Sequence, residues 1–362
     1  MLNWLLVFIP VAIGLEFFRP DQHSLIFIAA ALGIVPVAGW LGNATEHLAH
    51  HLGEGIGGLL NATFGNAAEL IIALIALQKG LYPVVKASLT GSIIGNVLLV
   101  LGAAALAGGM KYKKQRFNLT AARAQATQLT LTSIAFIMPA AFHYLAGPQG
   151  RVREDDLSLE ISIVLLIAYA AHLVFSLITH KQLFAGEQTE AGAEHEAEWS
   201  IGKSVAVLAG ATALLAWLSE ILVGSVEPAA ASFGMTRVFV GVIVVAIIGN
   251  AAEHSTAIMM ALKNRMELSM GIAIGSSVQI ALFVAPVLVI ISHFIGPRPM
   301  DLVLSPAEVL SIFAAVLITG QMAGDGESNW LEGAQLLIVY LILALVFYFL
   351  PDTMPGPSAQ HG

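Results

Sequence analysis

Eleven apolar segments, each about as long as a helix that crosses a lipid bilayer, run through this chain. They lie near residues 2–18, 24–45, 55–78, 84–109, 123–146, 157–180, 201–226, 234–262, 267–296, 303–322 and 331–350. A membrane-spanning helix needs about 20 apolar residues, and backbone groups within lipid must be satisfied inside the protein. The segments are too long and too uniformly apolar for barrel strands. We therefore expect an all-α integral membrane protein with about eleven transmembrane helices.

The composition excludes several classes of protein. Of the 362 residues, 57% are hydrophobic and 11% are charged, whereas a soluble domain carries roughly a quarter charged residues. A net charge of -8, from 16 Lys and Arg against 24 Asp and Glu, argues against a nucleic-acid partner. No Gly-x-Ser-x-Gly or His-Glu-x-x-His motif is present, so we expect no enzyme activity. Without cysteine, a metal ion would be held by oxygen or imidazole.

The two halves of the chain resemble each other. Gly-Asn-Ala-Ala-Glu at 65–69 recurs 184 residues later at 249–253, and the same shift relates Gly91-Ser92 to Gly275-Ser276 and Lys79 to Lys263. A weaker match relates Thr45-Glu46 to Ser219-Glu220 with a shift of 174. Five spans separate the two motifs, so their helices cross the membrane in opposite directions. Inverted repeats of this kind are typical of secondary transporters, whose binding site lies at the midplane.

The repeat suggests a division of the chain into five parts. We expect an extra N-terminal helix at 1–22, five-helix repeats at 23–180 and 201–350, an acidic loop at 181–200 and a flexible tail at 351–362. The acidic loop carries several glutamates between Glu187 and Glu198, which are either regulatory or merely solvated. Lys111, Lys113, Lys114 and Arg116 form the densest basic cluster, which predicts a cytoplasmic loop and a cytoplasmic N-terminus.

Glu69 and Glu253 are the strongest candidates for a functional site. A carboxylate inside a membrane helix is costly and usually marks an ion pathway, although a neutral, hydrogen-bonded structural Glu is the alternative. Asn66 and Asn250 precede them by three residues, which places each pair on one helix face. Glycine before each Asn loosens the helix and can free backbone carbonyls. The resulting set of oxygens suits a hard cation, calcium above all.

Small polar residues interrupt the fourth and ninth spans and could complete the shell around the cation. They are Ser92, Asn96, Ser276, Ser277 and Gln279. Ordinary hydrogen bonding between helices is the alternative for each of them. The two halves differ here, since Asn96 aligns with Ile280 and Gln279 with Gly95.

Four further groups are weaker candidates. His254 follows Glu253 and could sense or relay protons. Glu46 and Glu220 could attract cations at opposite faces, or only anchor the helices at the interface. His47, His50 and His51 share a helix face and could capture zinc or nickel, although solvated interfacial histidines are the favoured interpretation.

These motifs resemble those of the calcium/proton exchanger family of the cation/calcium exchanger superfamily. The resemblance rests on residues 57–71, 91–96, 249–254 and 275–283, with Ala-Thr-Glu at 44–46 and Ser-Glu at 219–220. It implies a ten-helix core preceded by one extra helix, with Glu69 and Glu253 as the central carboxylates and Asn66, Asn250, Ser92, Ser276 and Gln279 around them. The absence of a long N-terminal tail resembles prokaryotic members, for which the inner cell membrane is the expected location.

The sequence thus predicts an antiporter that exchanges calcium ions for protons by alternating access. Two carboxylates in a low-dielectric site resist ionisation together, so the site must hold either calcium or protons. A sodium-coupled or less selective divalent-cation exchanger is one alternative, and a calcium channel is another. The transported ions and the lipid bilayer are the expected partners, with no cofactor. A homo-oligomer is compatible with the sequence.

Overall fold

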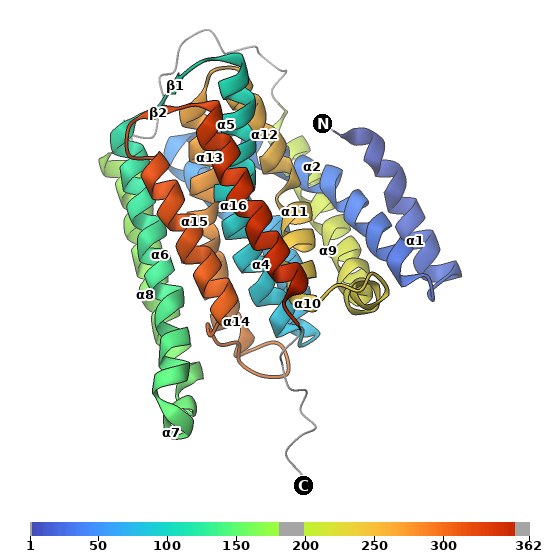
Figure 1. Ribbon diagram of the computed structural model, residues 1–362. Helices are drawn as coiled ribbons and strands as arrows, with labels where there is room; N and C mark the ends of the chain where they lie inside the picture. The colour runs from blue at the N-terminus through green and yellow to red at the C-terminus, as the bar shows by residue number, and fades with distance from the viewer. Residues whose placement is uncertain (1, 181–198, 352–362) are drawn as a thin grey trace.

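The computed structural model describes residues 2–180 and 199–351, which form a bundle of helices (Figure 1). The acidic segment between Glu187 and Glu198 and the tail from residue 352 lie outside the described residues. The first half contains η1 Asn3–Val7, α1 Phe8–Phe18, α2 His23–Phe64, α3 Ala67–Gln78, α4 Tyr82–Ile94, η2 Gly95–Val100, α5 Leu101–Lys111, β1 Gln115–Arg116, α6 Leu119–Leu145, α7 Gly147–Arg151, α8 Glu154–Val174 and η3 Phe175–Thr179.

The second half is also almost entirely helical. It contains α9 Ile201–Ser232, α10 Arg237–Phe239, η6 Val240–Val245, α11 Ala246–Gly249, α12 Ala251–Leu262, α13 Met266–Gln279, η7 Ile280–Val284, α14 Ala285–Ser292, α15 Pro306–Met322, β2 Glu327–Ser328 and α16 Trp330–Phe349. Within the described residues, six helices are long and apolar enough to cross a membrane, and a seventh span is formed if the bent pair Arg237–Gly249 and Ala251–Leu262 is counted. The protein is therefore a helical, multi-pass membrane protein, while the count of eleven spans stays a prediction.

One expected loop is wrong. The sequence separates spans at 24–45 and 55–78, but α2 is helical from His23 to Phe64 and the chain breaks only at Gly65 and Asn66. The helix is sharply bent between Ala49 and Gly57. Eight residues of straight helix span about 12 Å, yet a Cβ at Gly57 would overlap the carbonyl oxygen of Ala49. Glycine permits this close approach, so the chain turns without leaving the helical state.

Both repeats break at the same residue and carry a π-helical turn at the same place. Asn66 and Asn250 have non-helical backbone angles and directly precede α3 and α12. The π-helical segments η2 and η7 follow the paired Gly-Ser motifs at nearly equivalent positions. Single π turns widen a helix locally and are frequent at functional sites, so the irregular backbone of both repeats is concentrated around the repeated motifs.

The two repeats pack closely through glycines. A Cβ at Gly91 in α4 would overlap the carbonyl oxygen of Val242 in η6, and a Cβ at Gly241 would overlap the side chain of Ala87. Small residues let membrane helices approach at backbone distance, which is where their association is strongest. This contact fixes the helix that carries Ser92 against the segment that leads to Asn250.

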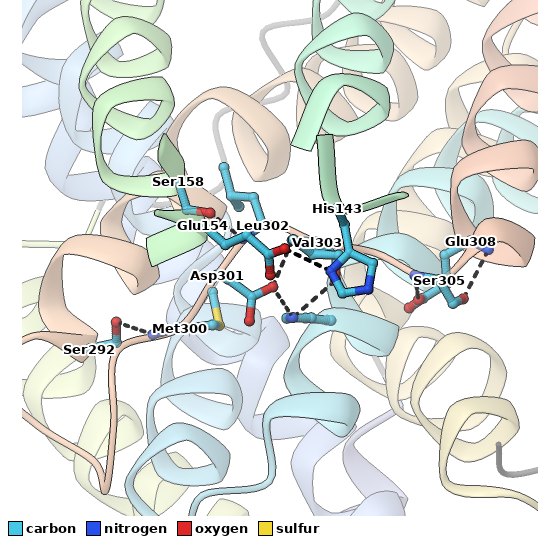
Figure 2. A network of polar contacts seen from close by, with 11 residues as sticks. His143, Glu154, Ser158, Ser292, Met300, Asp301, Leu302, Val303, Ser305 and Glu308 are labelled. Atoms are coloured by element: carbon cyan, nitrogen blue, oxygen red, sulfur yellow. Dashed lines mark hydrogen bonds and ion pairs between the residues drawn. The ribbon is translucent and has the colours of Figure 1, made fainter. Parts of the chain in front are cut away.

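A polar network fastens one end of the bundle (Figure 2). Lys86 of α4 donates to Asp301 at 2.5 Å and to the carbonyl of Val303 at 3.0 Å, although the Lys86 side chain is only 11% exposed. Beside it, Ser305 and Glu308 form a capping box at the start of α15, and Thr90 donates to Glu308 at 3.5 Å. The network joins the first repeat to the loop between α14 and α15.

The other end of the bundle is closed by the antiparallel pair β1 and β2, in which Arg116 lies opposite Glu327. Lys114 donates to Glu327 at 2.5 Å, and this hydrogen bond and the lysine's charge hold the pKa of the Glu327 carboxyl below 4.5. Lys114 belongs to the basic cluster from Lys111 to Arg116, so this cluster and the strand pair lie at the same end of the bundle.

Helices α2 and α9 pair along their length and lie with α1 on one side of the molecule (Figure 1). Ser24 and Ser232 are hydrogen-bonded at 2.5 Å at one end of the pair. At the other end, His47 stacks on Trp199 with 4.8 Å between ring centroids, and His51 bonds to the Trp199 carbonyl at 2.7 Å. His47 and His51 therefore both contact Trp199, just before the start of α9, an arrangement that fits helix anchoring.

Candidate functional site

The candidate site begins with two half-helices that start in the interior of the protein. Asn66 caps α3 and Asn250 caps α12, and each Asn is 1% exposed. Glu69 and Glu253 each lie in the first turn of the helix that follows. The N-terminus of a helix carries partial positive charge and free N–H groups, so each carboxylate lies where an anion is stabilised. Half-helices that begin at a break are a recurring feature of transporter sites.

In each repeat, a serine is hydrogen-bonded to the asparagine at the helix break of the other repeat. Ser276 donates to the side-chain oxygen of Asn66 at 2.8 Å, and Asn250 donates through its amide nitrogen to Ser92 at 2.9 Å. The shift of 184 residues relates these two bonds to each other. The polar residues expected in the fourth and ninth spans therefore meet the two motifs at the centre of the bundle.

Asn96 and Gln279 make the site asymmetric. Gln279 accepts a hydrogen bond from Asn66 at 2.5 Å, whereas Asn96 donates to Asn250 and to Ser276, each at 3.1 Å. Ser276 Oγ also lies 2.9 Å from Oε2 of Glu253, so Asn66 and Glu253 share the single proton of this hydroxyl, and polar contacts connect Glu253 to both asparagines. Glu69 and Ser92 are the equivalent pair of the first repeat. Within the described residues, no hydrogen bond joins these two side chains to each other.

Two buried oxygens at this site have no hydrogen-bond partner within the part of the chain that the structure describes. They are Oε1 of Glu69 and Oδ1 of Asn96. A small cavity, lined by Glu69, Ile72, Ser88, Ser92, Val245 and Gly249, adjoins the Glu69 carboxylate. Unpaired buried acceptors are costly, and buried polar groups are normally satisfied. Carboxylate, amide and hydroxyl oxygens with free acceptor capacity fit a cation as the missing partner.

The two carboxylates lie close enough to repel each other. Ser276 contacts both Asn66, three residues before Glu69, and Glu253, and Gly249, four residues before Glu253, lies beside the Glu69 carboxylate. Glu69 is 9% exposed, while Glu253 is half-buried. Glu253 is thus the less buried of the two residues.

Four candidates stand apart from this cluster. Ser277 donates to the carbonyls of Ile93 and Ala273, so it fastens α13 to α4 and does not face the carboxylates. His254 is half-buried and makes no hydrogen bond with Glu253. Glu46 and Glu220 have exposed side chains on α2 and α9 and take no part in the hydrogen-bonded cluster.

Sequence reasoning missed Ser88 and Gly249 as neighbours of Glu69. Ser88 lies one helical turn before Ser92, a spacing that places both on one face and that could have been used to find it. A Cβ at Gly249 would lie 3.2 Å from Oε1 of Glu69, so this glycine leaves room for the carboxylate. The i, i+3 argument for Asn66 and Glu69 needs correction, because Asn66 is the cap of the helix and not part of it.

Comparison with known proteins gives the family. The sodium/calcium exchanger protein family matches residues 23–178 and 203–349, which is most of the chain. The chain belongs to this family. This membership confirms the resemblance found in the motifs.

This exchanger-family chain has close relatives with names and solved structures. It is 46% identical to the Ca(2+)/H(+) antiporter of Synechocystis sp. over 361 residues, which cover 96% of each protein. It is 46% identical to the Ca(2+)/H(+) antiporter ChaA of Bacillus subtilis over 331 residues, which cover 90% of this chain and 93% of the relative. The solved structure of native YfkE has 40% identity and a TM-score of 0.80, covering 96% of this chain and all of that one.

Proposed function

We propose that this chain is a secondary active antiporter that exchanges calcium ions for protons at the Glu69 and Glu253 site. The proposal rests on one observation: two carboxylates, one from each repeat, lie in a single buried cluster of oxygens. In this cluster, Oε1 of Glu69 and Oδ1 of Asn96 lack a hydrogen-bond partner among the described residues. The two similar proteins from Synechocystis and Bacillus are named Ca(2+)/H(+) antiporters, and they support calcium and protons as the ions of this chain.

The coupling follows from charge. Two ionised carboxylates in a membrane interior are unstable without a cation, because neither water nor a counter-ion offsets their repulsion. One calcium ion neutralises both, and so do two protons. If the empty, ionised site cannot pass between the two open states, calcium leaves only when protons enter. Exchange then needs no energy source beyond the two ion gradients.

The surrounding side chains have separate roles in this mechanism. Glu69, Glu253 and the oxygens of Asn66, Asn96 and Gln279 are proposed as calcium ligands, since calcium takes six to eight oxygens in flexible geometry. Ser92, Ser276 and Asn250 hold those ligands through the hydrogen bonds between the repeats. His254 is proposed as a proton-sensing group beside the site.

We also propose an orientation. The basic cluster from Lys111 to Arg116 faces the cytoplasm by the excess of basic residues on that side. The N-terminus then lies in the cytoplasm. The membrane is the inner cell membrane if the source is prokaryotic.

The test is calcium uptake into proteoliposomes with an acidic interior. The uptake is compared with and without a protonophore, and with external sodium replaced by potassium. Uptake that collapses with the pH gradient and ignores sodium supports the proposal. Uptake that depends on sodium would assign the chain to sodium coupling, and calcium flux that needs neither gradient would identify a channel.

A further inference from the structure

Lysines 79 and 263 end the two half-helices that carry the site carboxylates. Each is the C-terminal cap of its helix, ten residues after Glu69 or Glu253, and the two occupy equivalent positions in the repeat. Nothing in the exchange chemistry uses them. Both side chains are exposed, although each belongs to a helix that begins at the ion site.

The two lysines lie at opposite faces of the bundle. The continuous span Tyr82–Lys111 runs from one face to the other. Lys79 lies three residues before Tyr82, whose hydroxyl bonds to Arg298 at that face. Lys263 follows Leu262, whose carbonyl accepts a hydrogen bond from Lys111 at 3.0 Å at the other face. A contact made by one lysine therefore acts only on the route that connects the ion site with the face where that lysine lies.

Lys79 ties its half-helix to the pair formed by α2 and α9. Its Nζ donates to the backbone carbonyl of Glu220 in α9 at 3.2 Å. Gly224 lies beneath the ammonium group, and a Cβ there would be 3.3 Å from Nζ. The absence of a side chain at residue 224 is what leaves room for the lysine.

The equivalent contact at the other face is not made. The weaker repeat match relates Glu220 to Glu46, so the expected partner of Lys263 is the carbonyl of Glu46 in α2. Among the residues that the structure describes, the Lys263 side chain has no hydrogen bond or ion pair, and both Lys263 and Glu46 are exposed. The shift of 174 residues that relates Glu220 to Glu46 also relates Gly224 to His50. The imidazole of His50 therefore leaves less room for the Lys263 side chain on α2 than Gly224 leaves for Lys79 on α9.

The exposure of the two carboxylates agrees with this difference. Glu69, on the side where the lysine contact is made, is buried, whereas Glu253, on the side where it is absent, is half-buried. The lysine contact is thus made on the side of the more deeply buried carboxylate, as expected if the contact closes the route on that side.

We infer that Lys79 and Lys263 are alternating gate residues, each closing the route on its own face by binding the backbone of the helix pair α2 and α9. When Lys79 binds α9, the route along α12 is open. In the opposite state, Lys263 binds α2 at Glu46 and the route along α3 opens. This inference rests on the alternating access of the proposed function, and it requires neither calcium nor protons as the ions.

The experiment uses the absence of cysteine from the chain. Ser88 lines the cavity beside Glu69, and Ile272 is its equivalent in the second repeat. Ser88→Cys and Ile272→Cys variants in proteoliposomes are labelled with a membrane-impermeant maleimide from each face in turn. The labelling rates report which route is open and need no ion gradient, so a failure here is separate from a failure of calcium/proton exchange.

Lys79→Met should raise the labelling rate of Ser88→Cys and lower that of Ile272→Cys, because losing the Lys79 contact favours the state that is open on its face. We expect a change of roughly fivefold, the size of a typical coupling between two states. Lys263→Met should lower the labelling of Ser88→Cys, and Lys79→Arg, which keeps the donor, should restore the original rates. Unchanged rates in Lys79→Met, or a rise at both cysteines, would overturn the inference.

Gly224→Ala provides a second test that removes no charge and does not alter Lys79 itself. The added methyl group crowds Nζ, so the variant should shift both labelling rates in the same directions as Lys79→Met. Labelling rates equal to those of the parent protein would contradict the inference, even if Lys79→Met fails to fold.

Discussion

Ser276 donates a hydrogen bond of 2.8 Å to the side-chain oxygen of Asn66, at the residue where the helix of the other repeat breaks. Asn250 makes the reciprocal bond to Ser92. The two repeats therefore stabilise each other's irregular backbone, and neither half-helix would be held in place by its own repeat alone. The ion site is in this sense a property of the interface between the repeats.

Replacing Asn66 or Asn250 by Ala should weaken calcium transport without unfolding the protein. Each change leaves buried partners without a hydrogen bond, which costs about 1–3 kcal/mol, and about 1.4 kcal/mol corresponds to a tenfold change in an equilibrium constant. The half-saturating calcium concentration for uptake into proteoliposomes should rise about tenfold. Thr132→Ala, which removes a buried bond to the carbonyl of Gln128 in α6, is the matched control. Equal effects in both kinds of variant would contradict the assignment.

Gly91→Ala should lower thermal stability more than Gly95→Ala, although both change a buried glycine in the same span. A Cβ at Gly91 would overlap the carbonyl oxygen of Val242, whereas no atom outside the local helix lies within 4 Å of a Cβ at Gly95. Overpacking typically costs about 1–3 kcal/mol. Thermal unfolding in detergent, followed by the loss of monodisperse protein, measures the difference. Two variants of equal stability would refute the close contact between α4 and η6.

Lys86→Met should be strongly destabilising, because it leaves the half-buried Asp301 without its cation. Removing one partner of a buried ion pair costs about 3–5 kcal/mol. The double variant Lys86→Met with Asp301→Asn should recover much of this loss. Lys114→Met, at a pair in which the lysine is 69% exposed, should cost less than about 1 kcal/mol. Chemical denaturation of the four proteins checks the order, and a harmless Lys86→Met would disprove the role of the network.

The internal repeat, the two carboxylates and the polar residues expected near them follow from local motifs, and the structure places these polar residues together between the repeats. Their role as an ion site stays a prediction. Glycine before Asn66 and Asn250 also indicated a loosened helix, and the breaks occur there. Contacts that join distant parts of the chain were not predictable. Lys86 and Asp301 are 215 residues apart, and Lys79 and Glu220 are 141 apart. Such pairs are decided by helix packing, which no local pattern encodes.

The sequence also could not predict how the backbone bends. The π-helical turns at Gly95–Val100 and Ile280–Val284 have ordinary apolar sequences, and only the packing around them shows why the helices widen. The sequence separates the expected spans 24–45 and 55–78, whereas α2 continues through this segment to Phe64 and bends near Gly57. In both places the helix continues under a local distortion.

Acidification should weaken the pairing of β1 with β2. Lys114 lowers the pKa of Glu327, so the bridge stabilises the folded state above pH 4.5. That contribution is lost as the pH falls through the lowered pKa, since the carboxyl then takes up a proton. A carboxyl-selective NMR titration should give a pKa for Glu327 below 4.5, and Lys114→Met should raise it. An unchanged pKa in that variant would disprove the contribution of this bridge.

The most direct measurement of the central claim is the proton flux that calcium itself drives. Proteoliposomes holding a pH-sensitive dye, with the membrane potential clamped, receive external calcium and no other gradient. We expect calcium to drive protons out of the vesicles through the unaltered protein and through Glu227→Gln, a change at a surface ion pair. Glu69→Gln and Glu253→Gln should each abolish the signal. Calcium-driven proton flux that persists in either site variant would contradict the account.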